Sequence, residues 1–71
     1  MNIKYFEDTD TAIFEFTDNE VKETKEVGEN IFIDLDDNGN IVNITIEHAN
    51  RNANIQEFSF KRIHKKSAKV A

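Results

Sequence analysis

The sequence contains no cysteine, no proline, no tryptophan and only two glycines among its 71 residues. Without cysteine, neither a disulfide nor a thiolate-bound metal can stabilise the chain. The two glycines cannot build a glycine-rich loop that cradles phosphate groups. Because one hydrophobic core of this size supplies only about 3–5 kcal/mol of net stability, we expect one small domain.

Long apolar runs are also missing. No stretch approaches the roughly 20 apolar residues of a membrane-spanning helix. The N-terminal sequence MNIKYFEDTD lacks the basic region followed by an apolar one that marks a signal peptide. We therefore expect a cytoplasmic protein with no membrane partner.

Residues suited to catalysis are few. The two serines, Ser59 and Ser67, lie outside any glycine-rich turn. The two histidines, His48 and His64, lack the H-x-x-x-H spacing with which a helix holds zinc. The sequence therefore predicts no enzymatic activity, no catalytic residue and no cofactor.

Charge is divided unevenly along the chain, whose net charge is −5. Residues 1–60 hold all 14 acidic residues and four basic ones, a net charge of −10. Residues 61–71 hold five basic residues and no acidic one, a net charge of +5. The acidic body would repel phosphate, so nucleic acid is not an expected partner. We predict one domain over residues 1–64 and a basic, frayed C-terminal tail over residues 65–71.

Apolar and polar residues alternate with a period of two through much of the chain, which predicts strands rather than helices. Ile3 and Tyr5 share one face of a first strand, and Ala12 and Phe14 share one face of a second. Residues 21–27, VKETKEV, place two valines on one face. We predict an edge strand there, where lysines discourage pairing with a foreign strand; a short exposed helix is the alternative.

The segment DLDDNGN, residues 34–40, fits two different structures. It matches the opening of a calcium-binding loop, D-x-[DN]-x-[DN]-G. Such a loop needs a bidentate glutamate at its twelfth position, which is Thr45 in this chain, and its flanks should be helices. The Asn38-Gly39 pair between apolar runs favours a tight β-hairpin instead, with a two-residue type I′ turn.

The hairpin hypothesis fixes how its two strands pair. Each apolar residue on one face then meets another apolar residue, in the pairs Leu35 with Val42, Ile33 with Ile44, and Ile31 with Ile46. The opposite face pairs Asp36 with Ile41, Asp34 with Asn43, and Phe32 with Thr45. A slip of one residue would move the whole apolar set to the solvent side, so this register is strongly specified.

The pattern changes after the hairpin. The polar segment HANRNAN predicts one short helix near residues 48–55, which its asparagines can cap. The following QEFSFKR alternates again and places Phe58 and Phe60 on one face. We favour a final strand over residues 57–63; a helix over residues 50–66 is the alternative.

These segments predict an α+β fold. Its main part is an antiparallel β-sheet of four to six short strands with a tight hairpin at Asn38-Gly39, and its helical part is the short helix near residues 48–55.

Two groups of side chains project from the outer face of the predicted sheet. The polar group is able to hold a hard cation or a small ligand and consists of Asp34, Asp36 and Asn43. The apolar group marks a partner surface, unless the C-terminal segment covers it, and consists of Ile13, Phe32 and Ile41. Because polar residues are ordinary on the solvated side of a sheet, we predict no metal site and favour the apolar group as a protein interface.

The order of these segments resembles a family of small bacterial proteins typified by YuzE. The similarity covers about residues 1–50, through IKYFEDTDTAIFEF, VKETKEV and IFIDLDDNGNIVNITIEHA. The residues that lie where this family has them are Tyr5, Asp10, Thr24, Val27, Asp36 and Gly39. Two positions depart, since Asn43 replaces the usual glycine and Thr45 the usual acidic residue, which weakens a carboxylate site on the outer face.

The resemblance implies a compact α+β domain with a mainly antiparallel sheet and with no established activity. Small acidic proteins of this kind sometimes look like the antidote half of a toxin–antitoxin pair, whose charge complements that of a basic toxin. We therefore expect a non-enzymatic, cytoplasmic protein-interaction module that forms a homo-oligomer, such as a dimer, or binds a protein partner. The alternative is a metal- or small-ligand-binding domain that uses the outer face of the hairpin.

Overall fold

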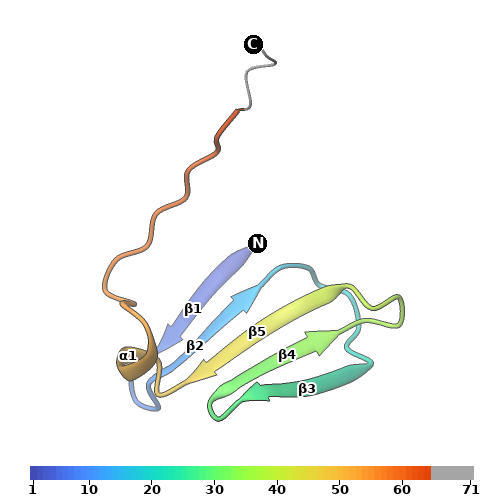
Figure 1. The fold of residues 1–71 in the computed structure, drawn as a ribbon, viewed down its shortest axis with the longest axis horizontal. Helices are drawn as coiled ribbons and strands as arrows, with labels where there is room; N and C mark the ends of the chain where they lie inside the picture. Colours follow the sequence, from blue (N-terminus) through green and yellow to red (C-terminus); the bar gives the residue numbers. More distant parts are fainter. Residues whose placement is uncertain (65–71) are drawn as a thin grey trace.

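The structure is a computed structural model that describes residues 1–64, so the predicted tail over residues 65–71 lies outside the described residues. Over the described part, the chain forms one five-stranded antiparallel sheet and one short helix (Figure 1). In chain order the elements are β1 (Asn2–Phe6), β2 (Thr11–Glu15), β3 (Glu23–Gly28), β4 (Ile31–Leu35), β5 (Ile41–Glu47) and α1 (Ala49–Asn52). The predicted fold class and the predicted four to six strands are confirmed.

The strands lie side by side in the order β1-β2-β5-β4-β3. β3, β4 and β5 follow one another as neighbours, and β5 then pairs with β2. β5 is therefore the central strand, while β1 and β3 form the two edges (Figure 1).

The registers of the four strand pairs divide the side chains between two faces, because successive residues of a strand point to opposite sides. The inner face is apolar across four strands and consists of Ile3, Tyr5, Ala12, Phe14, Ile31, Ile33, Leu35, Val42, Ile44 and Ile46. The outer face is mostly polar and includes Lys4, Phe6, Ile13, Glu15, Thr24, Glu26, Phe32, Asp34, Asn43 and Thr45.

The hairpin between β4 and β5 confirms most of the predicted register. The pairs found as expected are Ile31 with Ile46, Phe32 with Thr45, Ile33 with Ile44, and Asp34 with Asn43. The prediction was wrong next to the turn, where an irregularity pairs Leu35 with Ile41 instead of Val42. The alternation that was expected to place Ile41 opposite Asp36 therefore breaks at this point.

The turn lies where it was predicted, but it is not a type I′ turn. Only Gly39 of the Asn38-Gly39 pair has a positive φ, of 82°. The Gly39 N–H donates to the Asp36 carbonyl at 3.1 Å, and the Asp36 N–H donates to the Asn40 carbonyl at 2.9 Å. This is a three-residue loop that ends in a left-handed residue and a bulge. The Asp36 carboxylate favours it, because its Oδ1 accepts the N–H groups of Asn38 and Asn40, each at 2.9 Å.

β3 confirms the predicted edge strand in place of an exposed helix. It pairs with β4 through a regular register that shifts between Glu26 and Gly28. Val27 lies at this irregularity, and its side chain is largely exposed.

α1 confirms the predicted short helix, at four residues long. Residues 57–63 form neither the predicted final strand nor the alternative helix. After α1 the chain runs away from the sheet in an extended path (Figure 1). A strand needs a neighbouring strand to accept its hydrogen bonds, and at this corner the segment leaves the sheet without one.

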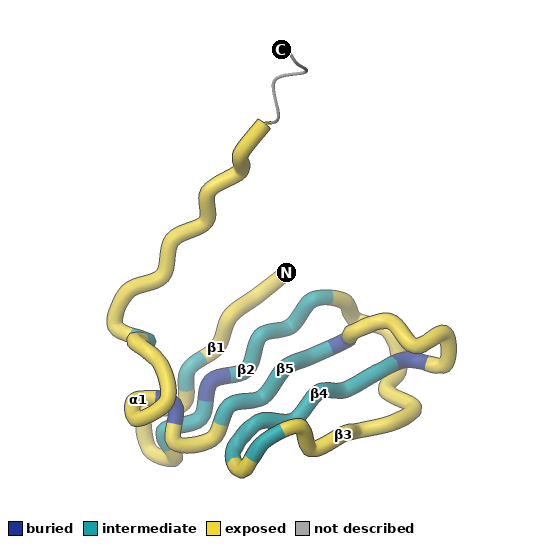
Figure 2. The backbone as a smooth tube through the Cα atoms, viewed as in Figure 1, coloured by how far each residue is buried: buried dark blue, intermediate teal, exposed yellow. Residues whose placement is uncertain are grey.

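Few side chains are buried (Figure 2). Within residues 1–64, the apolar residues that are buried are Ala12, Val42 and Ala49, and the buried polar residue is Asp36. The large inner-face residues of β2, β4 and β5 are only half-buried. The apolar face is therefore only partly buried across β2, β5 and β4.

The molecule has a larger surface and a larger radius of gyration than a compact chain of the same size. The accessible surface is 5765 Å², whereas a compact chain of 8.2 kDa exposes about 4,500 Å². The Cα radius of gyration is 15.3 Å, against about 11 Å for a compact chain of this length. Residues 56–64, which are exposed, contribute to this surplus of roughly 1,200 Å². None of the helical structure within residues 1–64 is long and apolar enough to cross a membrane.

Candidate functional site

The inner face is a continuous apolar surface. One row crosses the sheet through Ile3, Phe14, Ile44 and Ile33, and a second crosses it through Tyr5, Ala12, Ile46 and Ile31. Charged residues enter this face only at β3, where Glu23 lies opposite Leu35 and Lys25 lies opposite Ile33. A surface of this kind is typical of a binding site or of an interface between protein chains.

The described chain covers one corner of the inner face. A small pocket of about 100 Å³ lies between the sheet and the segment that follows α1. Ile3, Ala12 and Phe14 line it from β1 and β2, and Ile55 and Phe58 line it from the segment. The segment therefore touches β1 and β2 and leaves β5, β4 and β3 uncovered.

Hydrogen bonds tie the β1–β2 turn to α1. Asp10, in the left-handed conformation with φ 56°, accepts at its Oδ1 from the Tyr5 hydroxyl at 2.7 Å and from the Asn50 N–H at 3.1 Å. The Asn50 Nδ2 donates to the Tyr5 hydroxyl at 2.9 Å, and the Ala49 N–H donates to the Asp10 carbonyl at 2.9 Å. We call Tyr5, Asp10, Ala49 and Asn50 the Asp10 junction.

The pKa values of Asp10 and Tyr5 favour an ionised carboxylate as the acceptor and a protonated phenol as the donor. The hydrogen bond from Tyr5 lowers the pKa of Asp10 below its ordinary value, and the N–H of Asn50 lowers it further. The same bond to Asp10 raises the pKa of Tyr5. At neutral pH the carboxylate is therefore ionised and the phenol protonated, which is the arrangement that holds α1 against the turn.

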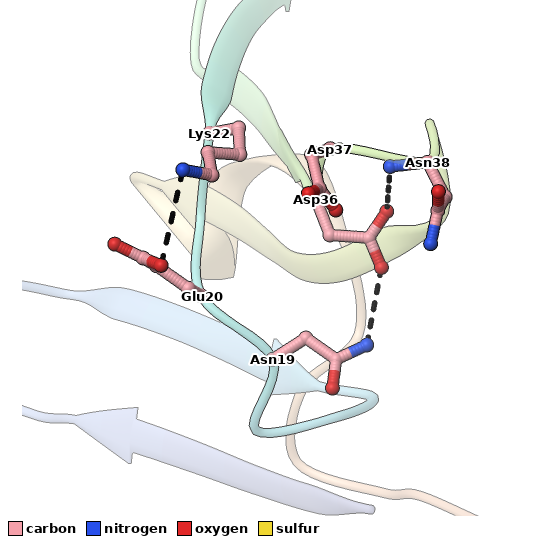
Figure 3. A pocket seen from close by; sticks show the side chains of 6 residues that line it. All are labelled: Asn19, Glu20, Lys22, Asp36, Asp37 and Asn38. Atoms are coloured by element: carbon pink, nitrogen blue, oxygen red, sulfur yellow. Dashed lines mark hydrogen bonds and ion pairs between the residues drawn. The ribbon is translucent and has the colours of Figure 1, made fainter.

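Asp36 lies at the other end of the sheet, beside a shallow pocket of about 310 Å³ (Figure 3). Its side chain points into the turn, where Oδ2 accepts the Asn19 Nδ2 at 3.1 Å (Figure 3). The opposite side of the pocket carries Glu20 and Lys22, whose charged groups lie 3.9 Å apart. We call residues 36–40 together with Asn19 the Asp36 turn.

The electrostatics of Asp36 follow from these contacts. The N–H of Asn40 is the main cause that lowers the pKa of Asp36, and the donors of Asn19 and Asn38 act in the same direction. Asp36 is only 7% exposed, and burial opposes this shift. Both carboxylate oxygens are therefore engaged by the chain itself, and Asp36 stabilises the turn and the loop before β3.

The structure brings together two of the three predicted polar ligands. Asp34 and Asn43 meet on the outer face, where the Asn43 Nδ2 donates to Asp34 Oδ2 at 3.1 Å and the Thr24 hydroxyl donates to Asp34 Oδ1 at 2.7 Å. Asp36 is not part of this group, because it belongs to the Asp36 turn. Within residues 1–64, no three Asp, Glu or His side chains are grouped as metal ligands are.

The predicted apolar group is interrupted by polar residues. Ile13 and Phe32 lie in one row across the outer face, with Thr45 between them, and Lys4 and Glu26 flank that row. Ile41 lies at the start of β5 and is largely exposed. The segment after α1 contacts the inner face instead of covering these residues. Their role as a protein interface stays a prediction.

Residues 2–50 match the protein family described as "Protein of unknown function (DUF2283)". The chain belongs to the DUF2283 family. The matched range spans β1 to β5 and ends within α1, so it contains the Asp10 junction and the Asp36 turn. The expected membership of a small family of unknown function is confirmed. No curated protein and no solved structure matches the chain.

Sequence reasoning missed three polar partners in this DUF2283 domain, namely Asn19, Asn50 and the N–H of Ala49. Tyr5 and Asp10 were noted as family-like positions, but their contact with Asn50 joins residues 40 or more positions apart. Strand alternation does not signal such a contact. Strand alternation also does not show which segment, if any, covers the inner face.

Proposed function

We propose that this DUF2283 chain is a non-enzymatic, cytoplasmic protein-interaction module that self-associates through its inner face. The observation that carries the proposal is the open apolar surface across β2, β5 and β4, which the described part of the chain covers only at one corner. Apolar surface left in water costs about 25 cal/mol per Å². Covering this face is the strongest driving force that the described chain has available for association.

A face-to-face dimer would cover the inner face of each copy. A standard protein interface buries about 800 Å² on each partner. Two sheets that pack face to face lie about 10 Å apart and bury both inner faces in one core.

The distribution of charge favours a second copy on the inner face rather than on the outer one. A two-fold interface brings the same patch of each copy together. The inner-face residues of β1, β2, β5 and β4 carry no charge, so two such faces meet without repulsion. The outer face carries Glu15, Glu26 and Asp34, and acidic groups would face one another across a symmetric contact.

Native mass spectrometry and analytical ultracentrifugation of the untagged chain test this proposal. We expect a dimer, at twice the chain mass of 8.2 kDa, which dissociates on dilution with one dissociation constant. A chain that stays monomeric up to millimolar concentration would refute self-association. A stable complex with a different protein in place of the dimer would also refute it, and would assign the inner face to another partner.

A further inference from the structure

The segment that leaves the sheet exposes two large apolar side chains. Residues 59–64 are exposed and have no regular structure, yet they include Phe60, 77% exposed, and Ile63, 82% exposed. Large apolar side chains do not stabilise a segment that stays in water. The DUF2283 match ends at residue 50, so this segment follows the family domain. We call residues 59–64 the arm.

The arm begins beside β1 and β2 of its own sheet. Phe58 lines the small pocket there with Ile3 and Phe14, and it is 63% exposed. An extended chain covers at most about 3.6 Å per residue, so Phe60 reaches no further than about 7 Å from Phe58. In its own sheet, β3 lies three strand spacings past β2, or about 14 Å. Its own β3 edge is therefore out of reach of Phe60.

The β3 edge of a second copy is within reach. We take the two-fold axis of the dimer to run parallel to the strands, which stacks the central strand β5 on β5. The same axis places β1 and β2 of one copy over β3 and β4 of the other. The separation between packed sheets is about 10 Å, which three or four extended residues after Phe58 can span.

The chemistry of the β3 edge fits the arm. Val21 is 40% exposed and Val27 is 55% exposed, and together they offer apolar contacts for Phe60 and Ile63. Residues 20–29 contain four glutamates and two lysines, a net charge of −2, whereas the arm contains Lys61 and Arg62. The opposite edge, β1, contains Lys4 and no acidic residue. The charges at β3 therefore admit a basic segment and repel an acidic one.

We infer that the arm docks along the β3 edge of a second copy, so that two arms are exchanged in the dimer. Phe60 contacts Val27 of that copy, and Arg62, which points to the same side of the extended arm as Phe60, lies beside Glu26. This inference rests on the proposed self-association and adds to it the place where each arm ends.

Chemical cross-linking tests the arm directly, because the sequence has no cysteine and any introduced thiol is unique. A full-length Ser59→Cys chain is mixed with a ¹⁵N-labelled Thr24→Cys chain and treated with a short bismaleimide. Thr24 lies in β3. The matched control pairs Ser59→Cys with Asn2→Cys, since Asn2 lies in β1 at the other edge. We expect the mixed-isotope covalent dimer to form severalfold faster with Thr24→Cys than with Asn2→Cys.

A matched pair of substitutions tests the energetic role of the arm. Phe60→Ser removes an apolar side chain from each arm and is expected to raise the dimer dissociation constant by at least about a hundredfold. Phe6→Ser makes the same change on the outer face, where Phe6 is largely exposed, and is expected to leave that constant unchanged. High salt is expected to weaken the wild-type dimer, because Lys61 and Arg62 contribute through charge.

The outcomes separate the arm from the dimer itself. A dimer with the Thr24 cross-link and a weak Phe60→Ser variant supports the exchanged arms. Equal rates of cross-linking at Thr24 and Asn2 would overturn the docking of the arm on β3. An unchanged dimer dissociation constant for Phe60→Ser would overturn it too. Either result, obtained with a dimer, would leave the proposed self-association unaffected. A cross-link formed within a single Ser59→Cys, Thr24→Cys double-variant chain overturns the exchange. A chain that is monomeric throughout overturns both.

Discussion

The two ends of this sheet and its inner face are stabilised in opposite ways. At the ends, the Asp10 junction and the Asp36 turn engage the buried and half-buried polar groups with partners from the same chain. No buried side-chain nitrogen or oxygen within residues 1–64 lacks a hydrogen-bond partner. On the inner face, large apolar side chains are only partly buried. The single chain thus completes its polar contacts and leaves its apolar contacts incomplete.

The polar groups of this domain find their hydrogen-bond partners within one chain, whereas its apolar face needs a further layer of structure. A carboxylate needs a few donors within about 3 Å, and a turn supplies them from neighbouring residues. An apolar face needs a second layer of matching area, and α1 with four residues is far too small to provide it. Substitutions at the ends should therefore change the folding of one chain, and substitutions on the face should change association.

The largest effect is expected from a charge on the inner face. Ile44→Asp places a carboxylate in the central strand opposite Ile33 and Phe14, and two of them would be buried in a symmetric dimer. Because burying an unpaired charge costs several kcal/mol, we expect the dissociation constant to rise by at least about a thousandfold. Sedimentation of the variant measures this.

The control for this prediction is the next residue of the same strand. Thr45→Asp adds the same charge on the outer face and is expected to leave association within about threefold of wild type. Circular dichroism of both variants checks that the sheet forms. Equal loss of association for the two variants would contradict the assignment of the interface to the inner face.

A smaller effect is expected from Asp36→Asn, which acts on folding. The folded-state pKa of Asp36 lies below its ordinary value, so its carboxylate stabilises the fold fully above about pH 4. That contribution is lost as the pH falls through the lowered value. At neutral pH we expect the variant to melt several degrees lower than wild type.

The pH dependence makes the test of Asp36 specific. The difference in melting temperature between wild type and Asp36→Asn should shrink as the pH falls below about 4. Asp37→Asn removes a charge one residue away, on an exposed side chain, and should not reproduce this dependence. A difference that stays constant down to acidic pH would show that the charge of Asp36 does not matter.

The smallest effect is expected at the glycine of the turn. Gly39 has φ 82°, and an added Cβ would meet no atom within 4 Å. Gly39→Ala should therefore destabilise the chain by about 1 kcal/mol through backbone strain alone. Gly28→Ala is the matched control, because its Cβ would meet Ile31 at an ordinary 3.7 Å. Chemical denaturation should find Gly28→Ala close to wild type.

The strands could be predicted well from the sequence because their information is local. Alternation located Ile33 opposite Ile44 and Ile31 opposite Ile46, and β3 was expected as an edge strand. The turn type could not be predicted from Asn38-Gly39 alone, because the Asp36 carboxylate binds two backbone N–H groups and favours the longer loop. The final strand expected over residues 57–63 failed for a related reason, since alternation does not supply a neighbour.

The candidate site was only partly predictable. Asp34 and Asn43 meet on the outer face because they are directly opposite in the hairpin. Asp36 follows Asp34 by two residues, the spacing that places both on one face of a strand. It lies in the turn instead and is not part of the outer face. Ile13 and Phe32 were placed on the outer face, and that placement is found with Thr45 between them.

The sequence determined the approximate number of strands, most of the β4–β5 register, the location of the hairpin and the division into an apolar and a polar face. These follow from the two-residue period of a strand, which needs no knowledge of distant contacts. Only the tertiary structure decided that the β1–β2 turn binds α1, that Asp36 serves the turn, and that the apolar face stays open. Those features depend on where distant segments lie in space, and the residues that follow Phe58 extend away from the sheet (Figure 1).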